Sequence, residues 1–270
     1  MAERKVAIVT GSGSGTGLGA ATALLLAQRG YNLLINYSRS EAQARQSQAA
    51  CGDTGADTLL LRGDVAEDAD CRAMVQAAVK RWGRIDVLVN NAGVSVFGDA
   101  ASWDALDVAA FQRVHAVNTI GTFQMVRASA TYLKASRGAI VNVSSTAGKL
   151  GIGSSVPYIA SKGAVNAMTL HLARELSPEV RVNAVCPGMI TTRWFVEGMG
   201  QQAYEKVKAG YECSVPLGRV STPEDVAEAI VWLSDGAPTV TGELVSLDGG
   251  MHLGAAPALR AIRQPRGIDA

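Results

Sequence analysis

The feature that most constrains this chain is a regular alternation of two kinds of segment along almost its whole length. Short apolar runs, most of them rich in β-branched residues, recur at residues 5–10, 32–37, 57–62, 86–91, 139–145, 180–186 and 243–249. Segments with helical periodicity lie between them, for example at 18–30, 70–83, 111–133 and 223–234. Strand–helix–strand repeats form parallel pairs through right-handed crossovers, and such strands are buried on both faces. The pattern therefore predicts an α/β fold with one doubly wound parallel sheet of about seven strands and helices on both faces.

The domain organisation follows from the absence of any break in composition. We expect a single domain over residues 1–250 and a C-terminal tail over 251–270, for which a loose terminus and a docked arm both remain open. The stretch 193–215 departs from the rhythm, because it mixes aromatics, glycines and charges before the next clear helix. Long connections of this kind often form lids or binding loops, so we expect a substrate loop there.

The composition excludes several classes of function. Hydrophobic residues make up 48% of the 270 positions and the net charge is +1, so nothing in the charge balance favours nucleic acid or an anionic membrane. The cysteines form no C-x-x-C pair and no histidine joins them at metal-ligand spacing; they are Cys51, Cys71, Cys186 and Cys213. We therefore expect reduced thiols and no metal. The first apolar run is too short for a signal peptide, and no segment approaches a membrane span, which predicts a soluble cytoplasmic protein acting on a small molecule.

A glycine-rich loop, "VTGSGSGTGLG", follows the first predicted strand directly. If a G-x-G-x-x-G/A dinucleotide motif is assigned to Gly15, Gly17 and Ala20, its first glycine lies well beyond the end of the strand. The better reading is Gly11, Gly15 and Gly17, with Ser14 and Thr16 between them, because the first glycine then sits at the turn. Such a loop brings backbone N–H groups and a helix N-terminus close to a pyrophosphate, so we expect dinucleotide binding here.

The end of the second predicted strand discriminates between dinucleotides. An acidic residue there would bind the adenosine ribose hydroxyls of NAD, whereas arginine suits the 2′-phosphate of NADP. Residue 37 is tyrosine, and Ser38, Arg39 and Ser40 follow it with a guanidinium and two hydroxyls. These residues predict NADP(H) in preference to NAD(H). Ser14 in the glycine loop is not basic, however, so a second cation is missing from the expected site.

Three polar residues are predicted to converge at the carboxyl edge of the sheet. Tyr158 and Lys162 lie four residues apart at the start of a predicted helix and therefore share one of its faces. Ser145 ends the strand that precedes this helix, where ligands bind in parallel α/β sheets. A phenol beside an ammonium group and a hydroxyl is a candidate proton-transfer site.

With these motifs in order, the chain resembles the short-chain dehydrogenase/reductase family over about residues 5–250. "TGSGSGTG", "NNAG", the serine and "YIASK" match the family's motifs in sequence and spacing. The resemblance implies a Rossmann-type sheet and cofactor contacts beyond the glycine loop at Asp64, Val65, Asn91, Ala92, Gly93, Pro187, Gly188, Ile190 and Thr192. Tyr158 and Lys162 would also contact the cofactor. The segment 216–250 resembles the ending of the subgroup that contains 3-oxoacyl-carrier-protein reductases.

The resemblance also implies catalytic roles for Asn118, Ser145, Tyr158 and Lys162. A free tyrosine has a pKa near ~10. The Lys162 ammonium, together with an oxidised nicotinamide, would lower that value and make Tyr158 a general acid and base. Ser145 would hydrogen-bond the substrate oxygen, and Asn118 would support a water relay. Assembly as a homotetramer through the helices at 111–134 and 157–177 is implied as well.

The substrate contacts are expected after the fourth strand, after Ser145 and in the 193–215 stretch. The candidates are Phe97, Ser145, Ser155, Trp194, Phe195 and Tyr204, whose aromatic rings suggest a partly apolar substrate. Two alternatives to a general carbonyl and alcohol oxidoreductase remain open. One is a 3-oxoacyl-(acyl-carrier-protein) reductase, and the other is a non-catalytic protein that senses a dinucleotide on the same fold.

Overall fold

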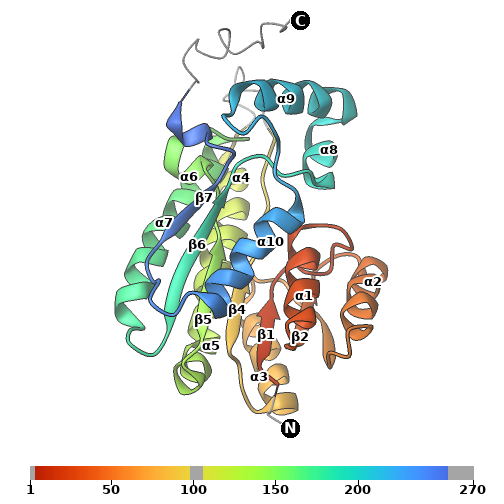
Figure 1. Ribbon diagram of the computed structural model, residues 1–270, viewed down its shortest axis with the longest axis vertical. Helices are drawn as coiled ribbons and strands as arrows, with labels where there is room; N and C mark the ends of the chain where they lie inside the picture. The colour runs from red at the N-terminus through yellow and green to blue at the C-terminus, as the bar shows by residue number, and fades with distance from the viewer. Residues whose placement is uncertain (1–3, 98–105, 255–270) are drawn as a thin grey trace, which may run out of the picture.

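A parallel sheet organises the computed structural model, which describes residues 4–97 and 106–254 (Figure 1). Within these residues the strands are β1 (Val6–Val9), β2 (Asn32–Tyr37), β3 (Thr58–Arg62), β4 (Val87–Asn90), β5 (Ala139–Val143), β6 (Arg181–Pro187) and β7 (Leu244–Leu247). Their order is β3-β2-β1-β4-β5-β6-β7, and every neighbouring pair is parallel. The predicted doubly wound fold is confirmed, and each strand lies within or next to its predicted run.

Helices cover both faces of this sheet. The helices α1 (Leu18–Gln28), α2 (Glu41–Gly52) and α10 (Pro223–Val231) pack on one face, and α3 (Asp68–Trp82), α5 (Thr122–Ser136) and α7 (Val156–Glu175) on the other. The first core contains Leu26 and Ile230, and the second contains Met74 and Met125, all of them buried. Burying one such side chain contributes about 1.5–3 kcal/mol, so the two apolar layers hold the sheet rigidly in place.

The helix predicted over 111–133 is interrupted in the structure. It consists of α4 (Val108–His115), a π-helical turn η2 (Ala116–Gly121) and then α5. The buried Asn118 lies within this wider turn. Single π-helical turns inside a helix frequently occur at functional sites.

The stretch predicted as a loop at 193–215 is helical instead. It forms α8 (Arg193–Met199) and α9 (Gln201–Ser214), which meet at Gly200, and both lie beyond the carboxyl edge of the sheet (Figure 1). A small core of Met189, Tyr204 and Val220 fixes them there. We refer to residues 193–214 as the lid. The remaining short elements are α6 (Ala147–Leu150), η3 (Trp232–Gly236) and η4 (Met251–Leu253).

Two features that are absent from the described part of the chain bear on function. No helix in it has the length and apolar character needed to cross a bilayer. The described residues also contain no group of three or more histidine, cysteine or acidic side chains placed to hold a metal ion. All four cysteines are free thiols, and only Cys213 is exposed.

Candidate active site

The glycine loop is held against the sheet by side chains from neighbouring strands. Gly11 has a φ of 66°, a backbone conformation that favours glycine, and its N–H donates to Asn36 Oδ1 at 3.0 Å. Asn91 Nδ2 donates to the carbonyl oxygens of Thr10 at 2.8 Å and Gly11 at 3.2 Å. A Cβ at Gly19 would lie 2.6 Å from the Gly11 oxygen, so only glycine lets α1 start this close to β1. The loop and the N-terminus of α1 are therefore fixed at the sheet edge.

A cavity of about 770 Å³ lies at the carboxyl ends of β1 to β4. Of the predicted cofactor residues, it is lined by Gly11, Ser38, Arg39, Asp64, Val65, Asn91, Ala92 and Gly93. Arg62 also lines it, a residue that the sequence analysis did not single out. Arg62 ends β3 and pairs in register with Tyr37. Because it stands at the end of a predicted strand, the sequence could have indicated it as a cofactor residue. We call this space the arginine cavity.

A second cavity, of about 570 Å³, lies next to it. Of the predicted residues, it is lined by Ser14, Thr16, Gly17, Asn91, Gly93, Phe97, Ser145, Tyr158, Lys162, Pro187, Gly188, Ile190, Thr192, Trp194 and Phe195. We call it the tyrosine cavity. It shares Asn91, Gly93 and Trp194 with the arginine cavity. Two adjoining spaces along a fixed glycine loop, one of them lined by Arg39, Arg62 and Arg113, fit an elongated dinucleotide.

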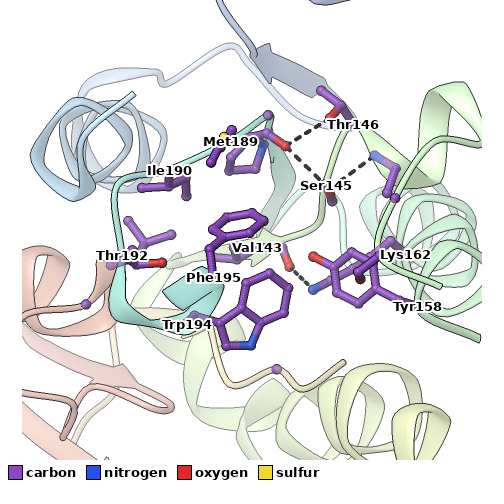
Figure 2. A pocket seen from close by; sticks show the side chains of 18 of the residues that line it. Val143, Ser145, Thr146, Tyr158, Lys162, Met189, Ile190, Thr192, Trp194 and Phe195 are labelled. Atoms are coloured by element: carbon purple, nitrogen blue, oxygen red, sulfur yellow. Dashed lines mark hydrogen bonds between the residues drawn. The ribbon is translucent and has the colours of Figure 1, made fainter. Parts of the chain in front are cut away.

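Ser145, Tyr158 and Lys162 meet in the tyrosine cavity, as the strand-end and helix positions predict (Figure 2). Lys162 Nζ lies 5.6 Å from the centroid of the Tyr158 ring and donates to the Val143 carbonyl oxygen at 2.7 Å. The Ser145 hydroxyl donates weakly to the Pro187 carbonyl at 3.4 Å and accepts from the Ala147 N–H at 3.1 Å. The strand end, α6 and α7 thus position these groups together.

Burial dominates the electrostatics of this group. It raises the pKa of Tyr158 to about 12, although the nearby Ser145 side chain acts in the opposite direction. It also lowers the pKa of Lys162 to about 8, because a buried ammonium loses its hydration. The expected lowering of the Tyr158 pKa by Lys162 is therefore absent from the free protein. The Lys162 ammonium hydrogen-bonds Val143 and does not offset the desolvation of the phenol.

Asn118 lies behind these residues and lines neither cavity. Its Oδ1 accepts from the Val94 N–H at 2.8 Å, and its Nδ2 donates to the Val94 carbonyl at 2.9 Å and to Ser161 Oγ at 3.0 Å. These bonds tie the segment after β4 to α7. The geometry gives Asn118 a positioning role, and its part in a water relay stays a prediction.

Several other predicted residues lie outside both cavities. Ser40 caps α2 and accepts from the Gln43 N–H, and the Gly15 N–H donates to Ser47 Oγ at 3.2 Å. Ser155 is buried at the start of α7, and its hydroxyl has no partner among the described residues. Tyr204 packs in the small core of the lid.

The sequence analysis singled out neither of two neighbouring serines, Ser154 in the tyrosine cavity and Ser95 in the arginine cavity. Ser154 lines the tyrosine cavity, and its hydroxyl lies 2.6 Å from that of Ser95. The pair links the segment after β4 to the loop before α7. No motif marks either serine, so only the three-dimensional arrangement reveals the pair.

An aromatic wall closes one side of the tyrosine cavity. The ring centroids of Phe97 and Trp194 are 5.0 Å apart, and those of Trp194 and Phe195 are 4.9 Å apart. Trp194 also approaches the Tyr158 ring to 5.7 Å between centroids. In Figure 2 the Trp194 and Phe195 rings lie between Thr192 and Tyr158. The lid therefore brings apolar surface directly to the candidate catalytic residues.

The sheet topology, the fixed glycine loop and the adjoining cavities define a class of protein, the dinucleotide-binding α/β proteins. Comparisons with known proteins narrow this class. The profile of a family described as enoyl-(acyl carrier protein) reductase matches residues 11–252.

Individual relatives agree with this profile. The chain is 41% identical to 2-(S)-hydroxypropyl-CoM dehydrogenase 3 of Xanthobacter autotrophicus over 77% of this chain and 82% of that protein. It is 32% identical to the 3-oxoacyl-acyl-carrier-protein reductase FabG of Staphylococcus aureus over 94% of this chain and 100% of that one. The crystal structure of levodione reductase matches with a TM-score of 0.82 and 30% identity, over 92% of this chain and 98% of that chain.

The chain belongs to the short-chain dehydrogenase/reductase family, as its motifs predict, and resembles the 3-oxoacyl-acyl-carrier-protein reductase group. It is an oxidoreductase of this family, whose members use nicotinamide dinucleotides.

Proposed function

We propose that the protein is an NADP(H)-dependent oxidoreductase that interconverts a carbonyl group and a secondary alcohol, with Tyr158 as the acid and base. The observation that supports this most strongly is the meeting of Ser145, Tyr158 and Lys162 in one cavity beside the glycine loop. A non-catalytic dinucleotide sensor would have no need for all three side chains.

In this mechanism a bound nicotinamide supplies or takes up the hydride. Tyr158 donates its hydroxyl proton to the substrate oxygen during reduction and accepts a proton from the alcohol during oxidation, which typically contributes ~10²–10⁴-fold to the rate. Ser145 donates a hydrogen bond to the same oxygen while charge builds up there. Lys162 holds positive charge beside the phenol. Asn118 fixes the position of the segment after β4 relative to α7.

The NADP(H) preference is supported by the charges in the arginine cavity. Arg39 and Arg62 both line it, and β2 ends at Tyr37 without an acidic residue. Arg113 lines it as well, and these guanidinium groups favour a phosphate on the adenosine ribose over a free hydroxyl. Asp64 lines the same cavity, but its Oδ1 already accepts from the Ala66 N–H at 3.0 Å.

Titration of the purified protein with NADPH and NADH tests this preference. We expect tighter binding of NADPH, and we expect Arg39→Met to weaken NADPH binding by about tenfold while leaving NADH binding almost unchanged. Equal affinities for the two cofactors in the wild-type protein would refute the preference.

The catalytic assignment is tested with Tyr158→Phe. Screening aldehydes, ketones, diketones and 3-oxoacyl thioesters by NADPH absorbance first identifies a substrate. The phenylalanine variant should then lose at least about 100-fold in turnover while binding NADPH normally, because only the proton donor is removed. Normal turnover would show that Tyr158 is not the acid.

Reduction of 3-oxoacyl carrier-protein thioesters is the second candidate function. It is favoured by the 32% identity to FabG, which extends over the whole length of that protein. Against it, Arg127, one of the few basic residues on the surface of α5, is already paired with Asp68 at 2.6 Å. The two candidates separate when the carrier-protein thioester and the matching free thioester are compared. A much lower KM for the carrier-bound form would favour the second function.

A further inference from the structure

Arg193, the first residue of the lid, reaches back across the tyrosine cavity to the glycine loop. Its Nη2 donates to the Ser14 carbonyl oxygen at 2.9 Å. With the side-chain oxygen of Gln43 turned toward the guanidinium, that oxygen accepts from both terminal nitrogens at 3.2 Å. Gln43 belongs to α2, so one arginine connects the lid, the glycine loop and α2.

The guanidinium has only neutral partners in these contacts. Arg193 forms no ion pair with any residue in the described ranges 4–97 and 106–254. Glu197, one turn further along α8, lines the same cavity but does not pair with it. The positive charge of Arg193 therefore remains uncompensated by a carboxylate, beside the loop that approaches a dinucleotide most closely.

The surroundings of Arg193 are those of an anion site. It lines the tyrosine cavity together with Ser14, Thr16 and Gly17, at the N-terminus of α1. The N-cap of α1 is Gly17, which has no side chain to cap the helix, and the Gly17 N–H donates to Ser14 Oγ at 3.1 Å. Unpaired N–H groups and the helix dipole favour negative charge at such a terminus, and a nearby guanidinium strengthens that preference.

This inference rests on the proposed function: we propose that Arg193 binds the pyrophosphate of the dinucleotide. The pyrophosphate is favoured over the 2′-phosphate because Arg193 lines the tyrosine cavity with the glycine loop. Arg39 and Arg62 line the other cavity. Arg193 therefore contributes to the binding of NADP and NAD alike, whereas Arg39 distinguishes them.

The same contact links cofactor binding to the shape of the substrate site. Trp194 follows Arg193 directly, lines both cavities, and lies 5.7 Å from the Tyr158 ring between centroids. When Arg193 engages a phosphate, the first turn of α8 is fixed and the aromatic wall is set in place.

ADP-ribose tests the proposal, because it carries the pyrophosphate but has neither a 2′-phosphate nor a nicotinamide. Isothermal titration of the full chain with ADP-ribose should give about tenfold weaker binding for Arg193→Met than for the wild-type protein. Arg39→Met should bind ADP-ribose as the wild-type protein does. The matched control is Arg29→Met, which removes an equal charge from an exposed arginine at the far end of α1.

Ionic strength separates a charge contact from a purely structural effect on the lid. The affinity of the wild-type protein for ADP-ribose should fall more steeply with added salt than that of Arg193→Met, because salt screens the missing interaction. Arg193→Lys should recover part of the affinity. Parallel salt dependences, or no recovery by lysine, would overturn the charge assignment.

Failure of the proposed function and failure of the role proposed for Arg193 give different results. If the wild-type protein binds neither NADPH nor ADP-ribose, the proposed function falls and this inference with it. If the wild-type protein binds both and Arg193→Met binds ADP-ribose equally well, only the role of Arg193 is refuted.

Discussion

Lys162 carries its charge in a buried position, where a charged side chain is disfavoured. It is 4% exposed, and burial lowers the pKa of its ammonium group from 10.5 to about 8. The unfolded chain therefore holds this proton more tightly than the folded protein does. Lowering the pH from 10.5 toward 8 progressively destabilises the fold, and the full penalty is present below pH 8. The proposed catalytic role of Lys162, a positive charge next to Tyr158, would account for this loss of stability.

This reasoning predicts that Lys162→Met stabilises the free protein at pH 7. Removing the buried charge should raise the free energy of unfolding by about 3 kcal/mol, and loss of the hydrogen bond to Val143 should take back about 1 kcal/mol. The gain should shrink as the pH approaches 10.5. Urea unfolding of the cofactor-free protein at pH 7 and pH 10 measures it, with the exposed Lys80→Met as the control. A gain of equal size at both pH values would contradict the burial argument.

The sequence predicts residues whose place is fixed by a turn, a strand end or a helix face, and it does not predict a residue whose side chain reaches across to another element. Gly11, Ser145 and Tyr158 were predictable because a turn, a strand end and a helix face fix where they lie. Arg193 was not, because its guanidinium reaches Ser14 only after α8 has folded over the loop. The raised pKa of Tyr158 in the free protein was not predictable for a similar reason, since burial depends on every element around the cavity, and the lowering expected with a bound oxidised nicotinamide stays a prediction.

At the scale of elements, helix starts with local signals were predictable. A proline followed by two acidic residues is typical of a helix start, and α10 begins with Pro223, Glu224 and Asp225. The structure shows a capping box there, in which Thr222 and Asp225 bond each other's backbone N–H groups. The π-helical turn η2 has no such local signal. It depends on bonds from Asn118 to Val94 and Ser161, which are distant in sequence. The helices of the lid were missed because aromatic residues and glycines obscure their periodicity.

Contact between α8 and Phe97 predicts the effect of a small substitution in the lid. A Cβ at Gly198 would lie 2.1 Å from a ring carbon of Phe97, so Gly198→Ala must displace the ring or the helix. Because Phe97 belongs to the aromatic wall, we expect the KM for the carbonyl substrate to rise by about tenfold, at a cost of about 1–3 kcal/mol from overpacking. Steady-state kinetics at saturating NADPH measure the change.

The control for this prediction lies in the same lid. A Cβ at Gly210 in α9 would meet no other heavy atom within 4 Å among the described residues. Gly210→Ala should therefore leave KM unchanged and stabilise α9 by up to about 1 kcal/mol through helix propensity. If both alanine variants have the KM of the wild-type enzyme, Phe97 does not shape the substrate site.

At the scale of the whole molecule, the sheet was predictable because each buried strand carries its own apolar run. The outer surface of α5 and α7, in contrast, carries large apolar side chains that are exposed. Ile120 is 51% exposed, Phe123 44% and Leu170 37%, and all three belong to η2, α5 or α7. Large apolar side chains gathered on neighbouring elements often mark a surface where subunits meet. We propose that this face joins the subunits of a homotetramer.

This proposal predicts that charge on the same face separates the subunits. The double variant Phe123→Glu and Leu170→Glu would bury two carboxylates without partners, so the assembly should dissociate. Sedimentation velocity should give four times the chain mass of 28.1 kDa for the wild-type protein and a smaller particle for the variant. Ala42→Glu with Ala50→Glu adds equal charge to exposed positions on α2, across the sheet, and should leave the tetramer intact. A wild-type protein that sediments as a monomer at micromolar concentration would rule the assembly out.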